Sequence, residues 1–163
     1  MYAVHTEMEE ILEQSDQPPP SVTIQGDASE HHAYLKENTI AALHFLKKVK
    51  SEISVRIVND EMMSNLHSMH SGIVSTTDVL TFDHASDDNA VRADIAICFD
   101  VAKRESEQRN NMLQSEMLLY ILHGVLHCCG FDDHDDVAYQ KMHTEEDRVL
   151  TAIGVGAVWS NVT

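Results

Sequence analysis

The feature that most constrains the fold of this chain is an apolar run at residues 117–122, which continues into the segment His-Gly-Val-Leu-His-Cys-Cys-Gly at 123–130. The run is helical in character, and on a helix His123 and His127 project from one face because they lie four residues apart. Glycine adopts the left-handed conformation at little steric cost, so Gly130 is the expected end of the helix. The sequence therefore predicts a central helix that carries two neighbouring histidines at its end.

Two imidazoles spaced in this way can bind one zinc ion from a single rigid helix. Two further candidate ligands, Asp133 and His134, follow the glycine, where we expect the chain to turn back toward the histidines. A lone histidine on an apolar helix face is usually a core residue, but a second one at i+4 and a third beyond a glycine stop favour a metal site. Three protein ligands with a fourth position left to water are typical of a catalytic zinc site rather than a structural one.

The residue after the first histidine distinguishes this motif from that of zinc peptidases. In the His-Glu-x-x-His motif the glutamate is the general base, whereas this chain has Gly124 at that position. A glycine there favours the close approach of another backbone or of a bulky substrate. A peptidase with this sequence would need its base from elsewhere in the chain.

Nearby acidic and thiol side chains are candidates for supporting roles. Glu116 lies seven residues before His123 on the same helix face, where it can orient the imidazole, carry a proton, or simply face solvent. The acidic cluster at 132–136 can tune the metal or carry a proton, or it can solvate the loop. Cys128 and Cys129 point about 100° apart on a helix, so they cannot both join the histidines, and we expect them to be buried.

The composition is that of one domain with an N-terminal appendage. The chain has 163 residues, and a proline triplet at 18–20 separates an appendage at 1–20 from a domain at 21–163. No apolar run approaches the ~20 residues of a membrane span, the N-terminus has no secretory signal, and three cysteines make no disulfide framework. We therefore expect a cytoplasmic protein. The net charge of −16 argues against indiscriminate nucleic-acid binding.

Periodicity and turn residues predict alternating strands and helices. The segment 94–99 carries apolar residues toward both faces, which is typical of a central strand. The order of the elements predicts the fold class α+β, a small mixed β-sheet of about four strands packed with about five helices, with the metal site at the end of a central helix. We expect strands at 21–25, 53–58, 77–82 and 94–99, and helices at 32–48, 60–71, 101–109, 113–129 and 137–153.

At these residues the chain resembles the YbeY family of bacterial endoribonucleases, also described as rRNA maturation factors. The family hallmark reads His-Gly-x-Leu-His-Leu-x-Gly-Tyr-Asp-His, and most of its first ten positions match or nearly match residues 123–132. A second family element, Thr-Asp-Val-Leu-Ser-Phe, is similar to the Thr-Asp-Val-Leu-Thr-Phe at 77–82. The resemblance covers about residues 21–155.

The resemblance implies a metal-dependent hydrolase with one zinc ion, which cuts single-stranded RNA in the maturation of the small-subunit rRNA 3′ end and in ribosome quality control. It implies single-stranded RNA, rRNA and the small ribosomal subunit as partners, with no DNA and no membrane. His123 and His127 would be the first two zinc ligands. The family's third histidine falls at Asp133 here, and we predict that the loop carries one extra residue so that His134 binds, with Asp133 as the alternative.

A second departure from the family pattern concerns the RNA. The family often has Tyr-Arg shortly before Thr-Asp-Val, and His70 and Ser71 stand at these positions, so the arginine associated with RNA is replaced. Two other functions therefore stay open. The first is a non-catalytic ribosome-assembly factor with a structural metal, which the missing arginine and the acidic net charge favour. The second is another zinc hydrolase such as a peptidase, which the spacing of His123, His127 and Asp133 permits.

Overall fold

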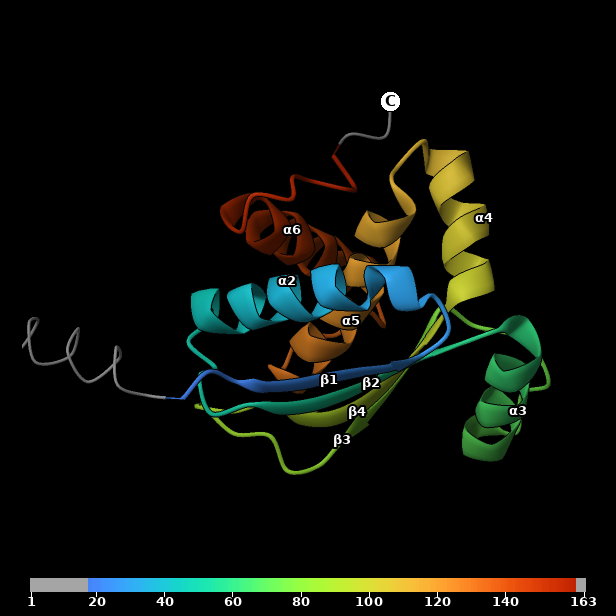
Figure 1. Cartoon of the computed structure of the whole chain (residues 1–163), viewed down its shortest axis with the longest axis horizontal. Helices are drawn as coiled ribbons and strands as arrows, with labels where there is room; N and C mark the ends of the chain where they lie inside the picture. Colours follow the sequence, from blue (N-terminus) through green and yellow to red (C-terminus); the bar gives the residue numbers. More distant parts are fainter. Residues whose placement is uncertain (1–17, 161–163) are drawn as a thin grey trace, which may run out of the picture.

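The computed structural model describes residues 18–160, which form a four-stranded mixed sheet with helices packed on it (Figure 1). The predicted α+β class, with about four strands and about five helices, is confirmed. The appendage predicted at 1–20 lies almost wholly outside the described residues. In order across the sheet the strands are β1 (Ser21–Gly26), β2 (Glu52–Val58), β4 (Arg92–Cys98) and β3 (Val79–Asp83). The helices are the 3-10 turn η1 (Ser29–His31), α2 (His32–Phe45), α3 (Asp60–Ser71), α4 (Phe99–Arg109), α5 (Leu113–Cys128) and α6 (Asp136–Ala152).

Both kinds of strand pairing occur in the sheet. β1, β2 and β4 run parallel, whereas β3 runs antiparallel beside β4. A parallel neighbour requires a crossover connection, which α2 supplies between β1 and β2. β3 and β4 follow each other in the chain, with Val79 opposite Ile97 and Phe82 opposite Asp94. This antiparallel edge makes the sheet mixed, as predicted.

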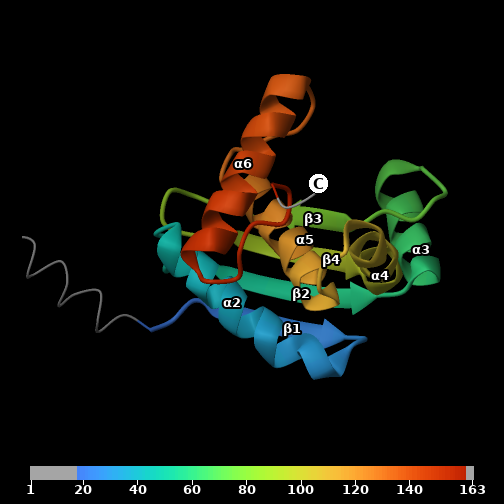
Figure 2. The ribbon, with the colours of Figure 1, turned by 90° about the horizontal axis from the view of Figure 1, so that it is seen from above.

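The two faces of the sheet are covered differently. Figure 2 shows α2, α5 and α6 together over one face, and α3 near one end of the strands. Along β2 the residues Ile53, Val55 and Ile57 are buried, whereas the alternate positions 52, 54 and 56 are exposed. On this second face α3 covers a small apolar cluster that contains Met63 and Cys98. Helices therefore cover one face of the sheet, where the large core lies beside α5, and only a small part of the other face, where α3 packs.

Helix α5 lies at the centre of the helical layer, in contact with α2, α4, α6, β3 and β4. Ten of its 16 residues are buried. A helix that is apolar on nearly all sides is stable only when other elements enclose it, which explains the uninterrupted apolar run at 117–122.

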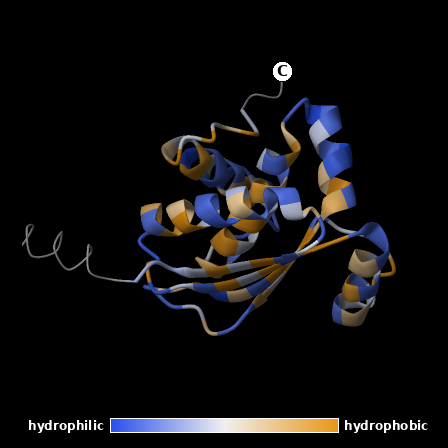
Figure 3. Cartoon of the chain, viewed as in Figure 1, coloured by the Kyte–Doolittle hydropathy of each residue, from blue (hydrophilic) through white to orange (hydrophobic). Residues whose placement is uncertain are grey.

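Figure 3 shows hydrophobic residues concentrated in the strands and the neighbouring helix surfaces, with α4 largely hydrophilic. No helix within residues 18–160 is long and apolar enough to cross a membrane.

Helix boundaries lie close to the predicted ones, with the clearest shifts at the end of α2 and the start of α4. Asn59 caps the start of α3 with its side chain, and Gly72 ends that helix with a φ of 76°. α2 ends at Phe45, earlier than predicted, because Lys47 takes a left-handed φ of 59° and turns the chain away. Phe99, expected at the end of a strand, is the first residue of α4.

Gly124 marks a close approach of α5 to the sheet. A Cβ atom at this position would lie 2.5 Å from Thr81 Oγ1 and 3.2 Å from Ile95 Cδ1. Both atoms belong to side chains of β3 and β4. The expected close approach is therefore present, but the expected partner was wrong: it is a pair of strand side chains rather than a backbone or a substrate.

We expect Gly124→Ala to destabilise the fold, because the added methyl group overpacks the contact between α5 and Thr81. Overpacking typically costs ~1–3 kcal/mol, and the higher helix propensity of alanine offsets ~1 kcal/mol of this. A net loss of about 1 kcal/mol should appear in the free energy of unfolding measured with urea. The double variant Gly124→Ala/Thr81→Ala should show a smaller loss relative to Thr81→Ala alone. Equal losses in the two backgrounds would contradict this account of the contact.

Candidate metal centre

His123 and His127 lie one above the other near the end of α5, as their spacing predicts. Their ring centroids are 4.6 Å apart, and the ring planes meet at 84°. The two Nε2 atoms face each other at 3.0 Å, a contact that requires one hydrogen between the nitrogens. A cation bound by both nitrogens would replace that hydrogen, because imidazoles bind metals through a free lone pair.

The turn after α5 brings a carboxylate to the same point. Gly130 takes a φ of 97° and ends the helix, as predicted. Asp133 then places its Oδ2 atom 3.3 Å from His123 Nε2 and its Oδ1 atom 3.7 Å from His127 Nε2. One ligand atom from each of these three residues lies within 4.8 Å of the other two. Two imidazole nitrogens and a carboxylate oxygen are a suitable donor set for zinc.

His134, predicted as the third ligand, lies beside this group rather than within it. Its side chain is exposed at the same pocket, and its backbone N–H donates a hydrogen bond of 2.6 Å to Asp132 Oδ1. Among the described residues, a ring nitrogen of His134 lies within 4.8 Å of carboxylate oxygens of Asp132 and Asp133. It does not lie this close to both histidines of α5. The ligand role of His134 stays a prediction, and Asp133 is the nearer candidate.

The other ring nitrogen of His123 contacts α6. Glu146 is fully buried, and its Oε1 atom accepts a hydrogen bond of 2.6 Å from His123 Nδ1. Glu146 was not predicted from the sequence, although a signal was available. Glu146 lies on the apolar stripe of α6 between Met142 and Val149, where a charged side chain needs a buried partner.

The two histidines respond differently to their surroundings. Burial and the neighbouring His123 both act on His127, and together they hold its pKa below the ordinary 6.5. Burial also acts to lower the pKa of His123, but the hydrogen bond to Glu146 and the charges of Glu146 and Asp133 outweigh it, so this pKa is raised. His123 is therefore the more basic member of the pair.

Glu116, considered as a partner of His123, serves a different region. Its side chain is fully buried, so an exposed glutamate is excluded, and Oε1 lies 3.4 Å from Arg109 Nη1 and 3.3 Å from Asn111 Nδ2. It does not line the pocket of the histidines. Glu116 thus connects the start of α5 to the end of α4, while Glu146 contacts the imidazole of His123.

The adjacent cysteines lie at the end of α5 without joining the group. Cys128 and Cys129 are free and half-buried, so the expected burial is confirmed only in part. Desolvation raises the pKa of both thiols, that of Cys128 to about 11. Neither sulfur belongs to a metal-binding cluster within the described residues.

The His123, His127 and Asp133 side chains open onto a pocket of about 740 Å³. Strand β3 forms one wall, and His67 and His70 of α3 lie on another. Its carboxylate side chains, besides that of Asp133, come from residues 78 and 83, and no lysine or arginine of the described chain lines it. The pocket therefore offers metal ligands and negative charge, but no cationic side chain.

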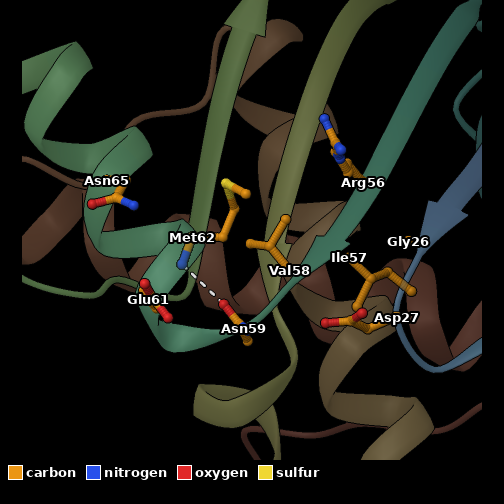
Figure 4. A pocket seen from close by; sticks show the side chains of 9 residues that line it. All are labelled: Gly26, Asp27, Arg56, Ile57, Val58, Asn59, Glu61, Met62 and Asn65. Atoms are coloured by element: carbon orange, nitrogen blue, oxygen red, sulfur yellow. Dashed lines mark hydrogen bonds between the residues drawn. The ribbon is translucent and has the colours of Figure 1, made fainter.

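A second pocket, of about 330 Å³, lies where β1 and β2 end and α3 begins (Figure 4). Asp27 follows β1, whereas Glu61 lies on α3, and the two side chains lie apart. They form no metal-binding cluster with other described residues. The Asn59 side chain already accepts the N–H of Met62 at 2.9 Å. This pocket does not bring reactive groups together.

Comparisons with known proteins identify the family of the chain. The family model described as Endoribonuclease YbeY matches residues 22–154. The chain belongs to the YbeY family. Its first two hallmark histidines are His123 and His127. At the position of the family's third hallmark histidine this chain has Asp133, the residue that the structure brings to these histidines.

Several proteins named Endoribonuclease YbeY are similar to the chain. One from Paraburkholderia phymatum is 30% identical over 127 residues, which cover 77% of this chain and 83% of that protein. One from Ralstonia nicotianae is 32% identical over 105 residues, covering 64% of this chain and 56% of that protein. The chain thus spans little more than half the length of the Ralstonia YbeY. A solution structure from Thermotoga maritima has a TM-score of 0.56 at 21% identity, covering 80% of this chain and 90% of that one, and so shares the fold.

We expect Glu116→Gln to change how stability depends on pH. Burial raises the pKa of Glu116 above its ordinary 4.5, although Arg109 and Asn111 act in the opposite direction. The folded protein then binds more protons than the unfolded chain above about pH 4.5, so this group's contribution to stability falls as pH rises. Glutamine cannot titrate, and the decline in unfolding free energy between about pH 4.5 and neutrality should flatten.

The measurement is urea unfolding at a series of pH values. Glu107→Gln is the matched control, because Glu107 is an exposed glutamate on α4. That variant should keep the pH dependence of the wild type. A Glu116→Gln curve parallel to the wild-type curve would show that the buried carboxyl does not titrate differently in the folded state.

Proposed function

We propose that this protein is a zinc-dependent endoribonuclease that cuts single-stranded RNA. Its proposed role is the maturation of the small-subunit rRNA 3′ end and ribosome quality control, in the cytoplasm. Membership of the YbeY family supports the class of reaction. The convergence of His123, His127 and Asp133 on an open pocket carries the proposal, because three donors beside a space for substrate are typical of catalytic zinc sites.

We assign the zinc ligands to His123 Nε2, His127 Nε2 and one oxygen of Asp133. His134 is the alternative third ligand, since it lies at the rim of the same pocket. The chemistry supplied by a bound zinc ion is Lewis acidity, which polarises a phosphoryl oxygen and makes water more acidic. The ligands come from a helix end and the adjoining turn, so one side of the group stays open to the pocket.

The charge of the pocket bears on how RNA is held. A phosphodiester is negatively charged, and the described walls offer Asp78 and Asp83 but no lysine or arginine. His67 Nδ1 is engaged with the carbonyl oxygen of Ser75 at 2.9 Å, which leaves its Nε2 as a polar contact on this wall. A divalent cation at the histidines would thus be the main positive charge beside which a phosphate can lie.

A ribosome-assembly factor with a structural metal is the second candidate function. The lack of a cationic side chain along the described pocket favours it, because RNA cleavage needs the phosphate to be positioned. Ser71, at the position of the family's arginine, is exposed and cannot supply that charge. Retained binding to the small ribosomal subunit without RNA cleavage would select this candidate.

RNA cleavage by the zinc-supplied protein should depend on His123. His123→Ala should lower the cleavage rate of a fluorescently labelled single-stranded RNA by at least about 100-fold, because Lewis-acid stabilisation of a phosphoryl transition state is worth several kcal/mol. A DNA oligonucleotide of the same sequence should stay intact, and Glu107→Gln should cleave like the wild type. Undiminished cleavage by His123→Ala in a nuclease-free preparation would rule out this function for the site.

Metal content distinguishes the two candidates for the third ligand. After incubation with zinc chloride and dialysis, the wild type should hold about one zinc ion per chain by elemental analysis. Asp133→Ala should lose the metal, while His134→Ala should retain it, because only the Asp133 carboxylate approaches both histidines. Loss with His134→Ala alone would instead assign His134, and the loop would then have to rearrange on binding.

A further inference from the structure

Glu146 is one of two fully buried glutamates in the described residues, and it lies on the side of His123 away from the open pocket. A buried carboxylate is costly unless hydrogen bonds satisfy its oxygens. Oε1 of Glu146 accepts from His123 Nδ1 at 2.6 Å, and Oε2 accepts from His143 Nδ1 at 2.9 Å and from Trp159 Nε1. Three ring N–H groups from three parts of the chain therefore converge on one carboxylate.

We propose that Glu146 is a positioning residue for His123, and that the segment 158–160 holds Glu146 in place. The inference rests on the proposed metal site, because it concerns how one ligand of that site is prepared for the metal. Glu146 touches neither the pocket nor a substrate there. It acts through the imidazole of His123.

The hydrogen bond determines which nitrogen of His123 is available. A carboxylate only accepts hydrogen bonds, so the Nδ1 atom of His123 must carry the hydrogen. In the neutral ring the lone pair is then on Nε2, the atom that faces His127 and Asp133. Without this acceptor the ring can carry its hydrogen on Nε2 and lose the lone pair that a metal needs. Such outer partners fix both the tautomer and the orientation of ligand histidines.

The indole of Trp159 closes the far side of this carboxylate. Its ring lies between His143, with centroids 3.8 Å apart, and Arg109, whose guanidinium carbon is 4.1 Å from the ring centroid. The indole N–H donates its hydrogen bond to Glu146 Oε2. Trp159 thus holds one oxygen of the carboxylate while His123 engages the other.

The backbone around Trp159 is bound by the next residue of α6. Asp147 Oδ1 accepts the N–H groups of Val158 at 2.8 Å and Trp159 at 3.0 Å, and Oδ2 accepts that of Ser160 at 2.9 Å. Two successive carboxylates therefore bind the segment 158–160. Asp147 accepts hydrogen bonds from the backbone of the segment, and Glu146 accepts one from the indole of Trp159. The segment 158–160 is in this way coupled to the metal ligand His123.

The first test measures zinc affinity at fixed pH by competition with a chromophoric chelator. Glu146→Gln should weaken zinc binding ~10–100-fold, the usual effect of removing an outer partner of a ligand histidine. Trp159→Phe keeps an aromatic ring at this position but removes the indole N–H, and should weaken binding by a smaller factor. Glu145→Gln is the matched control, because Glu145 pairs with Arg148 instead of the site, and it should bind zinc like the wild type.

The second test reads the tautomer of His123 and needs no metal. At about pH 9, where histidines are neutral, nitrogen NMR of histidine-labelled wild type should show the hydrogen on Nδ1. In Glu146→Gln the amide oxygen should turn toward the two donors His143 and Trp159, so its NH₂ group faces His123. That arrangement requires a lone pair on Nδ1, and the hydrogen should move to Nε2. A residue with a merely structural role would not invert the tautomer.

Two results together would overturn the proposal: zinc affinity within about 2-fold of the wild type in Glu146→Gln, and a hydrogen that remains on Nδ1. If Glu146→Gln fails to fold by circular dichroism, Trp159→Phe carries the affinity measurement, and an unchanged zinc affinity there would exclude the role of the segment 158–160. If the wild type binds no zinc but the tautomer inverts, the proposed metal site fails while the positioning of His123 by Glu146 stands.

Discussion

The structure depends on the enclosure of α5 between the sheet and the other helices. Gly124 lets the helix lie so close to β3 that a single methyl group would collide with Thr81. The helix cannot rotate in this position without exposing its apolar sides, so the directions of His123 and His127 are set by packing. Glu146 fixes the remaining freedom of His123, the rotation of its ring. The geometry of the candidate metal centre thus follows from core packing as well as from the polar contacts.

Much of the fold, and half of the candidate site, could be predicted from local patterns. The apolar run before His123, the glycine at 130 and the β-branched strands each act within a few residues, so their spacing is visible in the sequence. Contacts between segments that are distant in the chain were harder to predict from the sequence. Glu146 lies 23 positions after His123, and only its place on the apolar stripe of α6 marked it as unusual. The choice between Asp133 and His134 depends on the path of one loop, which periodicity does not describe.

The two departures from the YbeY pattern act in the same direction. An aspartate at 133 places a negative charge where the family has a neutral imidazole, and a serine at 71 removes a positive one. Compared with that pattern, the region is more negative by about two charges when histidine is neutral. Such a site attracts a divalent cation more strongly and repels a phosphate more strongly in its absence. For the proposed endoribonuclease, the two departures would therefore make RNA binding depend more strongly on a bound cation.

The adjacent carboxylates of α6 limit how this helix can change in evolution. Successive helical residues point about 100° apart, so Glu146 can reach the histidine while Asp147 reaches the terminal segment only at one rotation of the helix about its axis. Inserting or deleting a single residue between the start of α6 and position 146 would turn both carboxylates away from their partners. Length variation among related chains is thus more compatible with the exposed loop at 84–89 than with the body of α6.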